Sequence, residues 1–438
     1  MNFLYPLSAL LICVVLLVLS WKKPSLLLYF SLSFLLLGEI GRFSLPGMDQ
    51  EILFLDLFIL LSFPFYILRG LVKNHPLHLG KLFIPLLLFI CIALFSLLLS
   101  LYRYEAKEVV VASFYLLRFI VYAFLSIIAL NEKIKPYKLF LFLLIIALAL
   151  SALGFFQFVF FPDFSSMETF GWDPHIGRLL STWFDPNFMG GFLSFALLLL
   201  LNILFDKKLR KTERIFFILS AIILFVALVL TFSRSAYVMF IVGIFLTGLR
   251  APKMLLVFLS LSLLFYLFIP RMQERVNDLA GSMFAFATNS YDYGLDETAK
   301  LRVASWEESL SLFSAHPLLG IGYDTMLYEK LNRGDITDPT IHSGSGADSS
   351  LLTILVTTGI IGFLSFVWIM FTLFVIPYKT FRQKTSPPFV KNFALGFIIA
   401  LIALLVHSFF VNSLLLPFFL VPLFIMVGTL ENNRKVSL

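Results

Sequence analysis

Charged residues are scarce in this chain, and cysteine is almost missing. Only 13% of the 438 residues are charged, where a soluble domain has about a quarter. The two cysteines, Cys13 and Cys91, both lie in apolar runs, so the sequence indicates neither a disulfide framework nor a zinc site. A basic segment and a small-residue cleavage site are also missing around the first apolar run, so we expect that run to be retained.

Catalytic and metal-binding signatures are missing as well. The sequence contains no P-loop, no His-Glu-x-x-His and no Cys-x-x-Cys motif. We expect Asp185-Pro-Asn187 to form a helix-capping turn. The carboxylates of the predicted outer loops show no compact metal-ligand spacing: Asp173, Asp185, Asp292, Asp296 and Glu297. The sequence therefore predicts no metal site and no cofactor.

Apolar residues dominate what is present. They make up 60% of the chain, the mean hydropathy is +0.96, and Phe alone occurs 53 times. One water-soluble core cannot bury so much apolar surface, so the lipid bilayer must solvate the rest. The sequence predicts an all-α polytopic membrane protein with 12 or 13 transmembrane helices and one large extracytoplasmic loop that contains short helices. The net charge of +7 is distributed among loops, so we expect no nucleic-acid partner.

Apolar runs divide the chain into predicted spans and loops. The run 235–249 is short, and the last run contains Pro417 and Pro422, so twelve spans remain an alternative to thirteen. The runs are 3–20, 24–43, 51–68, 82–101, 109–130, 137–161, 186–205, 215–232, 235–249, 253–269, 349–377, 393–411 and 414–430. We expect N-terminal transmembrane helices in 1–161, a short extracytoplasmic loop in 162–185, central transmembrane helices in 186–270, a large extracytoplasmic loop in 271–348, and C-terminal transmembrane helices with a cytoplasmic tail in 349–438.

Lysine and arginine predict the orientation of these segments. One set of alternate loops carries roughly twice as many basic residues as the other, and cytoplasmic loops carry such an excess. Thirteen spans then place the N-terminus outside and the C-terminus inside. Both polar loops and the short turn around Arg234 fall on the extracytoplasmic side. Within the large loop, the spacing of apolar residues predicts an amphipathic helix over 298–316, followed by a turn-rich segment over 317–322.

Two charged residues fall inside predicted spans, where charge is costly and often functional. Arg118 lies in the run 109–130 and Asp56 in the run 51–68. They could form a buried ion pair that holds two helices in register. Alternatively, Arg118 faces a cavity and binds an anion, with Asp56 in a supporting role.

Arg234 lies between two apolar runs with almost no loop, in Leu230-Thr-Phe-Ser-Arg-Ser-Ala236. Its guanidinium suits phosphate oxygens, although an arginine there could also anchor at lipid headgroups. Arg302 begins the amphipathic helix and Arg178 lies in the short loop, where either could simply be solvated.

His342 is the candidate general base, because imidazole titrates near neutral pH. It lies in a Gly- and Ser-rich segment just before a span, where the glycines allow a ligand to approach the backbone. Asp348 and the neighbouring serines could orient the imidazole or a sugar. The alternatives are that His342 is an ordinary loop residue, or that His175 or His316 has this role.

Taken together in order, these segments resemble the O-antigen ligase and O-antigen polymerase superfamily of bacterial envelope glycosyltransferases. The resemblance covers roughly 170–430. It rests on Arg178-Leu-Leu-Ser-Thr-Trp-Phe-Asp-Pro-Asn-Phe-Met-Gly190, Leu230–Ala236, Arg302 followed by Trp306, Pro317–Gly322, the His342 loop with 351–362, and Val406-His-Ser-Phe-Phe-Val-Asn412. The sequence departs from the family in one place, because Ala347-Asp348 stands where members often have His-Asn.

The resemblance implies transfer of a glycan from a polyprenyl-diphosphate carrier to a hydroxyl of a glycan, lipid or protein acceptor. The reaction would proceed without metal or nucleotide sugar on the outer face of the bacterial plasma membrane. By matching motif, the base would be His342, and the diphosphate ligands would be Arg234, Arg302 and Arg178. Arg118 is a further candidate diphosphate ligand because of its position inside a predicted span. Ligase and polymerase differ only in acceptor, and the sequence is compatible with both.

Two other classes of protein fit parts of the pattern. A transporter or flippase of a lipid-linked or anionic solute would place charged residues along a path through both leaflets, whereas this sequence concentrates them on one side. A structural scaffold or receptor would need only the helices and would leave Arg234 unexplained. No internal repeat supports an inverted-repeat transporter.

Overall fold

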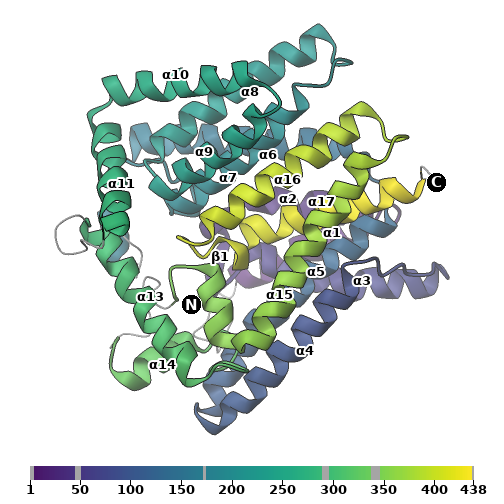
Figure 1. The fold of residues 1–438 in the computed structure, drawn as a ribbon. Helices are drawn as coiled ribbons and strands as arrows, with labels where there is room; N and C mark the ends of the chain where they lie inside the picture. The colour runs from purple at the N-terminus through teal and green to yellow at the C-terminus, as the bar shows by residue number, and fades with distance from the viewer. Residues whose placement is uncertain (1–3, 45–50, 171–173, 289–294, 337–345, 437–438) are drawn as a thin grey trace.

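The computed structural model describes residues 4–44, 51–170, 174–288, 295–336 and 346–436, and these residues are mostly helical (Figure 1). The helices are α1 (Leu4–Ser20), α2 (Ser25–Ser33), α3 (Phe54–Val72), α4 (Phe83–Leu99), α5 (Ala106–Asn131), α6 (Pro136–Phe160), α7 (Pro186–Ile203), α8 (Lys211–Leu230), α9 (Arg234–Gly248), α10 (Pro252–Phe268), α11 (Pro270–Thr288), α13 (Glu297–Ala315), α14 (Met326–Arg333), α15 (Ser350–Arg382), α16 (Pro388–His407) and α17 (Pro417–Val436). Strands β1 (Arg42–Ser44) and β2 (Glu51–Leu53) form a small antiparallel pair in which Arg42 lies opposite Leu53.

The prediction of an all-α polytopic membrane protein is confirmed. Eight helices in the described residues are long and apolar enough to cross a membrane, and the bent pair α10–α11 could add a ninth. This number is smaller than the predicted 12 or 13. Every predicted run contains a helix, but α1, α2 and α9 are short, and the apolar part of α17 gives way to Glu431 and Asn432. Apolar composition alone does not separate a full span from a short helix that is buried by its neighbours, as α9 is.

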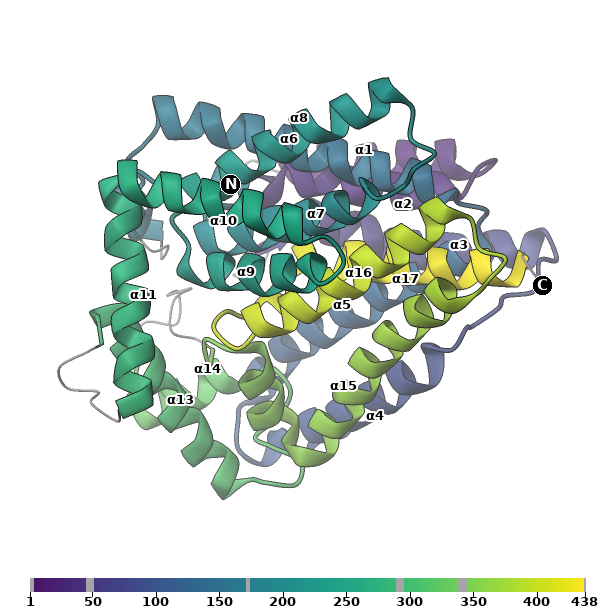
Figure 2. The same cartoon turned by 45° about the horizontal axis from the view of Figure 1, so that its top comes forward.

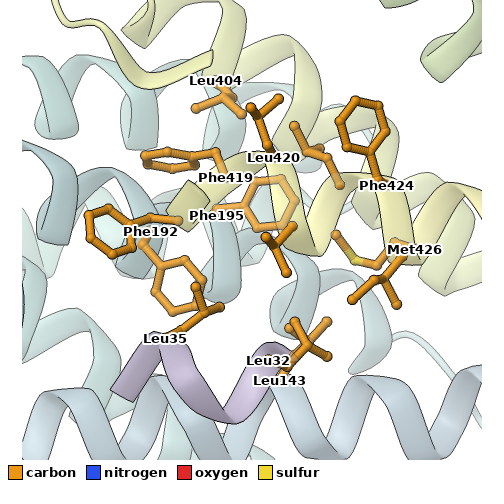
Figure 3. Packing of buried hydrophobic residues seen from close by; sticks show 14 of the residues in the cluster. Leu32, Leu35, Leu143, Phe192, Phe195, Leu404, Phe419, Leu420, Phe424 and Met426 are labelled. Carbon is orange, nitrogen blue, oxygen red and sulfur yellow. The ribbon is translucent and has the colours of Figure 1, made fainter. Parts of the chain in front are cut away.

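The centre of the bundle is an apolar core formed by helices from both ends of the sequence (Figure 3). Phe192 and Phe195 of α7 pack there with Phe419 and Phe424 of α17. Trp183, which lies just before α7 in the chain, is fully buried and stacks on Phe418 with ring centroids 3.9 Å apart. This core fixes the first turn of α7 and therefore the polar loop that precedes it.

The large polar segment forms one side of the molecule. α11 leaves α10 at an angle of 111° and leads to α13 and α14, which lie together at one edge (Figure 2). The predicted amphipathic helix over 298–316 is present as α13. These helices stand beside α9 and the first turns of α15, so two arginines predicted for the site approach each other from different helices.

An opened turn of α15 attaches the polar segment to the bundle. Gly359 interrupts α15 with φ of +64°, which favours glycine. The freed backbone bonds with the turn-rich 317–322 segment: Ile360 N donates to Pro317 O at 2.8 Å, and Ile321 N donates to Val356 O at 3.0 Å. Ser96 of α4 donates to backbone carbonyls of both segments. Two of the sequence motifs are therefore explained by how they bond to each other.

Candidate active site

The turn between α8 and α9 sets the position of Arg234. Phe232 has φ of +48°, and Ser233 caps α9 by accepting a hydrogen bond from Ala236 N. Arg178 Nε donates to Thr231 O at 2.9 Å, which ties the short polar loop to this turn. Arg234 is therefore the first residue of a helix whose start is fixed by a cap and by a second loop.

Arg234 is buried, with 9% of its side chain exposed, and it forms a two-pronged ion pair with Asp296. Its Nη2 lies 3.0 Å from Asp296 Oδ1, and its Nη1 bonds the other oxygen. Asp296 also caps α13 by accepting from Ala299 N at 3.1 Å. Burial acts to raise the pKa of Asp296, but the hydrogen bond and charge of Arg234 outweigh burial and lower it. The pair thus joins α9 to the start of α13.

A cleft that is partly open to solvent lies next to this pair. Its walls are mostly apolar, and among the described residues the two charged groups that line it are arginines from different helices. The lining residues are Arg234, Ser235 and Val238 of α9, Leu279 and Ser282 of α11, Ala299, Arg302, Val303 and Trp306 of α13, and Phe410. Two fixed guanidinium groups in a partly dehydrated cleft are suited to an anion with several oxygens.

Arg302 experiences the charges of residues on several elements. Burial lowers its pKa; among charges, Asp348 has the largest effect and raises it, while Arg234 lowers it. Asp296 and Asp185 raise it as well. The charges that act on Arg302 therefore come both from the Arg234–Asp296 pair and from the turn that precedes α15.

Asp185 lies at the start of α7 and confirms the predicted capping turn. Its Oδ1 accepts from Asn187 N at 2.6 Å and from Phe188 N at 3.0 Å. Burial raises the pKa of Asp185, and the two backbone donors and the charges of Arg178 and Arg302 oppose that rise. The Asp185 carboxylate thus interacts electrostatically with both Arg178 and Arg302.

Arg178 lies behind the α8–α9 turn and is not among the residues that line the cleft. Besides Thr231, its guanidinium donates to Phe232 O at 3.3 Å. Burial lowers its pKa, and Arg275 and Arg271 act in the same direction while Asp185 opposes them. In this structure Arg178 holds the backbone beside Arg234.

Arg118 and Asp56 form a separate cluster between α5 and α3. Arg118 Nε lies 2.9 Å from Asp56 Oδ1 and 3.0 Å from Tyr122 Oη, and Tyr122 in turn bonds Asp56. Asp56 also accepts from Leu53 N. The arrangement is the inter-helix ion pair that was one of the two interpretations of these residues, and it adds no lining residue to the cleft.

His342 lies outside the residues that the structure describes. Of its rivals, His316 bonds Arg103, with 2.9 Å between Nδ1 and Nη2, and His175 is buried in the short polar loop. Neither lines the cleft. Within the described residues, no three His, Cys, Asp or Glu side chains are arranged to hold a metal ion.

Several residues of the site were not predicted from the sequence. From the sequence, Asp296 was identified only as one of the carboxylates without metal-ligand spacing. Its partner Arg234 lies 62 residues away in the sequence. Trp306 and Phe410, whose ring centroids lie 6.1 Å apart, form an aromatic wall of the cleft. His407, in a motif quoted for the resemblance, is fully buried, and its Nδ1 lies 2.6 Å from Ser413 Oγ.

Fold and cleft together define a polytopic α-helical membrane protein with an arginine-lined cleft beside its large polar segment. Residues 219–367 match the family described as O-antigen ligase, and this stretch includes both arginines that line the cleft. The resemblance to O-antigen ligases is therefore confirmed, and it supports membrane glycan transfer as the general activity. No curated protein matches the chain.

Proposed function

We propose that the protein transfers a glycan from a polyprenyl-diphosphate carrier to an acceptor hydroxyl at the extracytoplasmic face of the bacterial plasma membrane. The observation that carries the proposal is that Arg234 and Arg302 line one cleft with mostly apolar walls. Such a cleft can receive an amphipathic donor, because it offers cations for the diphosphate and apolar surface for the lipid next to it.

Direct displacement accounts for the chemistry without a metal ion. The acceptor oxygen attacks the anomeric carbon while the bond from that carbon to the diphosphate oxygen breaks, so the configuration inverts. The electron pair leaves with the diphosphate, and Arg234 and Arg302 stabilise the charge that develops there. A base takes the hydroxyl proton; the family resemblance assigns this role to His342.

The test is a glycan-transfer assay with purified protein in the presence of a metal chelator. The donor is the lipid-linked glycan that accumulates in cells lacking the protein, supplied with candidate acceptors. We expect a new glycosidic bond, and a loss of about 10²-fold or more in turnover for Arg234→Ala or Arg302→Ala. Arg333→Ala is the matched control, because Arg333 pairs with Glu329 on α14 and does not line the cleft.

A flippase gives a different result in the same preparation. Reconstituted into liposomes, a flippase would move the lipid-linked glycan across the bilayer and form no new bond. Transport without product, or full turnover in both arginine variants, contradicts the proposed transfer.

A further inference from the structure

The segment before α15 is held in place from the side of the polar helices. Gly346 O accepts a hydrogen bond from Lys330 Nζ at 3.3 Å, and the buried Lys330 pairs with Glu308 of α13 at 3.0 Å. Ser305 of α13, one turn after Arg302, donates to the same carbonyl at 3.5 Å. Ala347 is fully buried in a small apolar cluster whose members are Leu312, Ile321, Met326, Ala347 and Val356.

The same segment is also held from the side of the membrane helices. Ser349 caps α15 by accepting from Leu352 N at 3.4 Å. Ser350 N donates to Ser408 O at 3.0 Å, and Ser350 Oγ accepts from Leu414 N at 3.0 Å. The residues on both sides of position 348 therefore have fixed positions.

Asp348 is the exposed side chain of this fixed segment, since Ala347, Ser349 and Ser350 are buried. Its φ of +49° is in the left-handed region, which Asp and Asn tolerate better than most residues. It is also the charge with the largest influence on Arg302. The segment that carries this carboxylate bonds Ser305, the neighbour of Trp306, and Ser408, two residues before Phe410, and both Trp306 and Phe410 line the cleft.

We propose that Asp348 is the base that removes the proton from the acceptor hydroxyl. This inference rests on the proposed function and assigns to Asp348 the role of base that the resemblance gives to His342. The hydroxyl proton passes to a carboxylate oxygen of Asp348 as the new bond from the acceptor oxygen to the anomeric carbon forms. The bond to the diphosphate breaks, and its electrons stay on the diphosphate between Arg234 and Arg302. Carboxylates serve as bases in other inverting displacements at sugars.

The burial of Ala347 explains why the neighbouring position is unsuitable. A side chain at 347 points into the cluster with Leu312 and Val356, away from solvent, so a base there could not reach an acceptor. Position 348 has the opposite environment. The carboxylate of Asp348 therefore lies at the exposed position of the 346–350 segment. The ion-paired helices α13 and α14, together with α15, hold that segment in place.

The experiment compares Asp348→Asn, Asp348→Glu and His342→Ala in single-turnover transfer, with the lipid-linked glycan from a deletion strain as donor. Asn is well suited to the replacement because it also tolerates the left-handed conformation and keeps the size. We expect Asp348→Asn to lose about 10²- to 10⁴-fold in the rate of bond formation. Donor binding should be retained, Asp348→Glu should recover part of the rate, and the rate should fall less in His342→Ala than in Asp348→Asn.

Asp335→Asn is the matched control, because Asp335 is an exposed carboxylate directly after α14 and outside the segment that precedes α15. The acid limb of the pH–rate profile should be present in wild type and His342→Ala and change in Asp348→Glu. Equal rates for wild type and Asp348→Asn, or a loss confined to His342→Ala, overturn the role of Asp348 alone. If the wild-type protein forms no product, the proposed function fails and the role of Asp348 fails with it.

Discussion

The ion pair between Arg234 and Asp296 makes a quantitative prediction about donor binding. Both prongs of the Arg234 guanidinium are occupied by Asp296 in this structure. A diphosphate that binds Arg234 must therefore displace the carboxylate. Asp296→Asn should tighten donor binding, because it removes the competing negative charge and leaves a residue that caps α13 equally well.

The size of this effect follows from the geometry of the pair. Hydrogen bonds to charged groups contribute about 1.5–3 kcal/mol. The Asp296 side chain is 24% exposed, so water screens the pair and the lower end applies. A change of about 1.5 kcal/mol corresponds to about tenfold tighter binding.

Calorimetric titration with farnesyl diphosphate at fixed salt measures this affinity without requiring the natural sugar. Asp296→Ala is the companion variant, since it removes both the charge and the cap and should destabilise α13 by about 1 kcal/mol more than Asn does. Unchanged or weaker binding by Asp296→Asn would refute competition and would make Asp296 a residue that positions Arg234.

Three further predictions concern other parts of the chain. Arg118→Ala should lower the free energy of unfolding by about 2 kcal/mol, because it leaves the half-buried Asp56 without its charged partner; unfolding in detergent measures this, and unchanged stability would contradict a structural pair. Burial raises the pKa of Asp324 to about 7, so stability should fall as pH rises from about 4 toward 7, because the folded state holds the proton that the unfolded state releases. Asp324→Asn should remove that slope, and a persistent slope would assign it to another group. Gly359→Ala should destabilise more than Gly334→Ala: both have positive φ, but a Cβ at Gly359 would lie 2.2 Å from a carbonyl oxygen whereas Gly334 has open space; equal Tm losses would contradict this.

The helical architecture could be predicted because the bilayer imposes a simple pattern. Apolar runs of about 20 residues indicate helices regardless of what packs against them. The cap at Asp185 was also predictable, because it depends on residues next to it in sequence. Which of the predicted runs are long helices could not be predicted in this way: α9, for example, is short and is buried between α7 and α16.

The contacts of the site could not be predicted in the same way. Arg234 and Asp296 meet through the bend between α10 and α11, whose angle of 111° no local pattern encodes. The resemblance assigned a diphosphate-binding role to Arg178, Arg234 and Arg302, but only the last two line the cleft. Ala347 and Asp348 are adjacent in sequence and differ completely in exposure, which depends on how α13, α14 and α15 pack.

The most direct test of the central claim is a double-mutant cycle on the transfer rate with Arg234→Ala, Arg302→Ala and the double variant. If both arginines bind one diphosphate in one cleft, the double loss should differ from the product of the single losses by a coupling of at least about 0.5 kcal/mol. Single losses that simply multiply, or single variants that retain full turnover, would contradict the shared site.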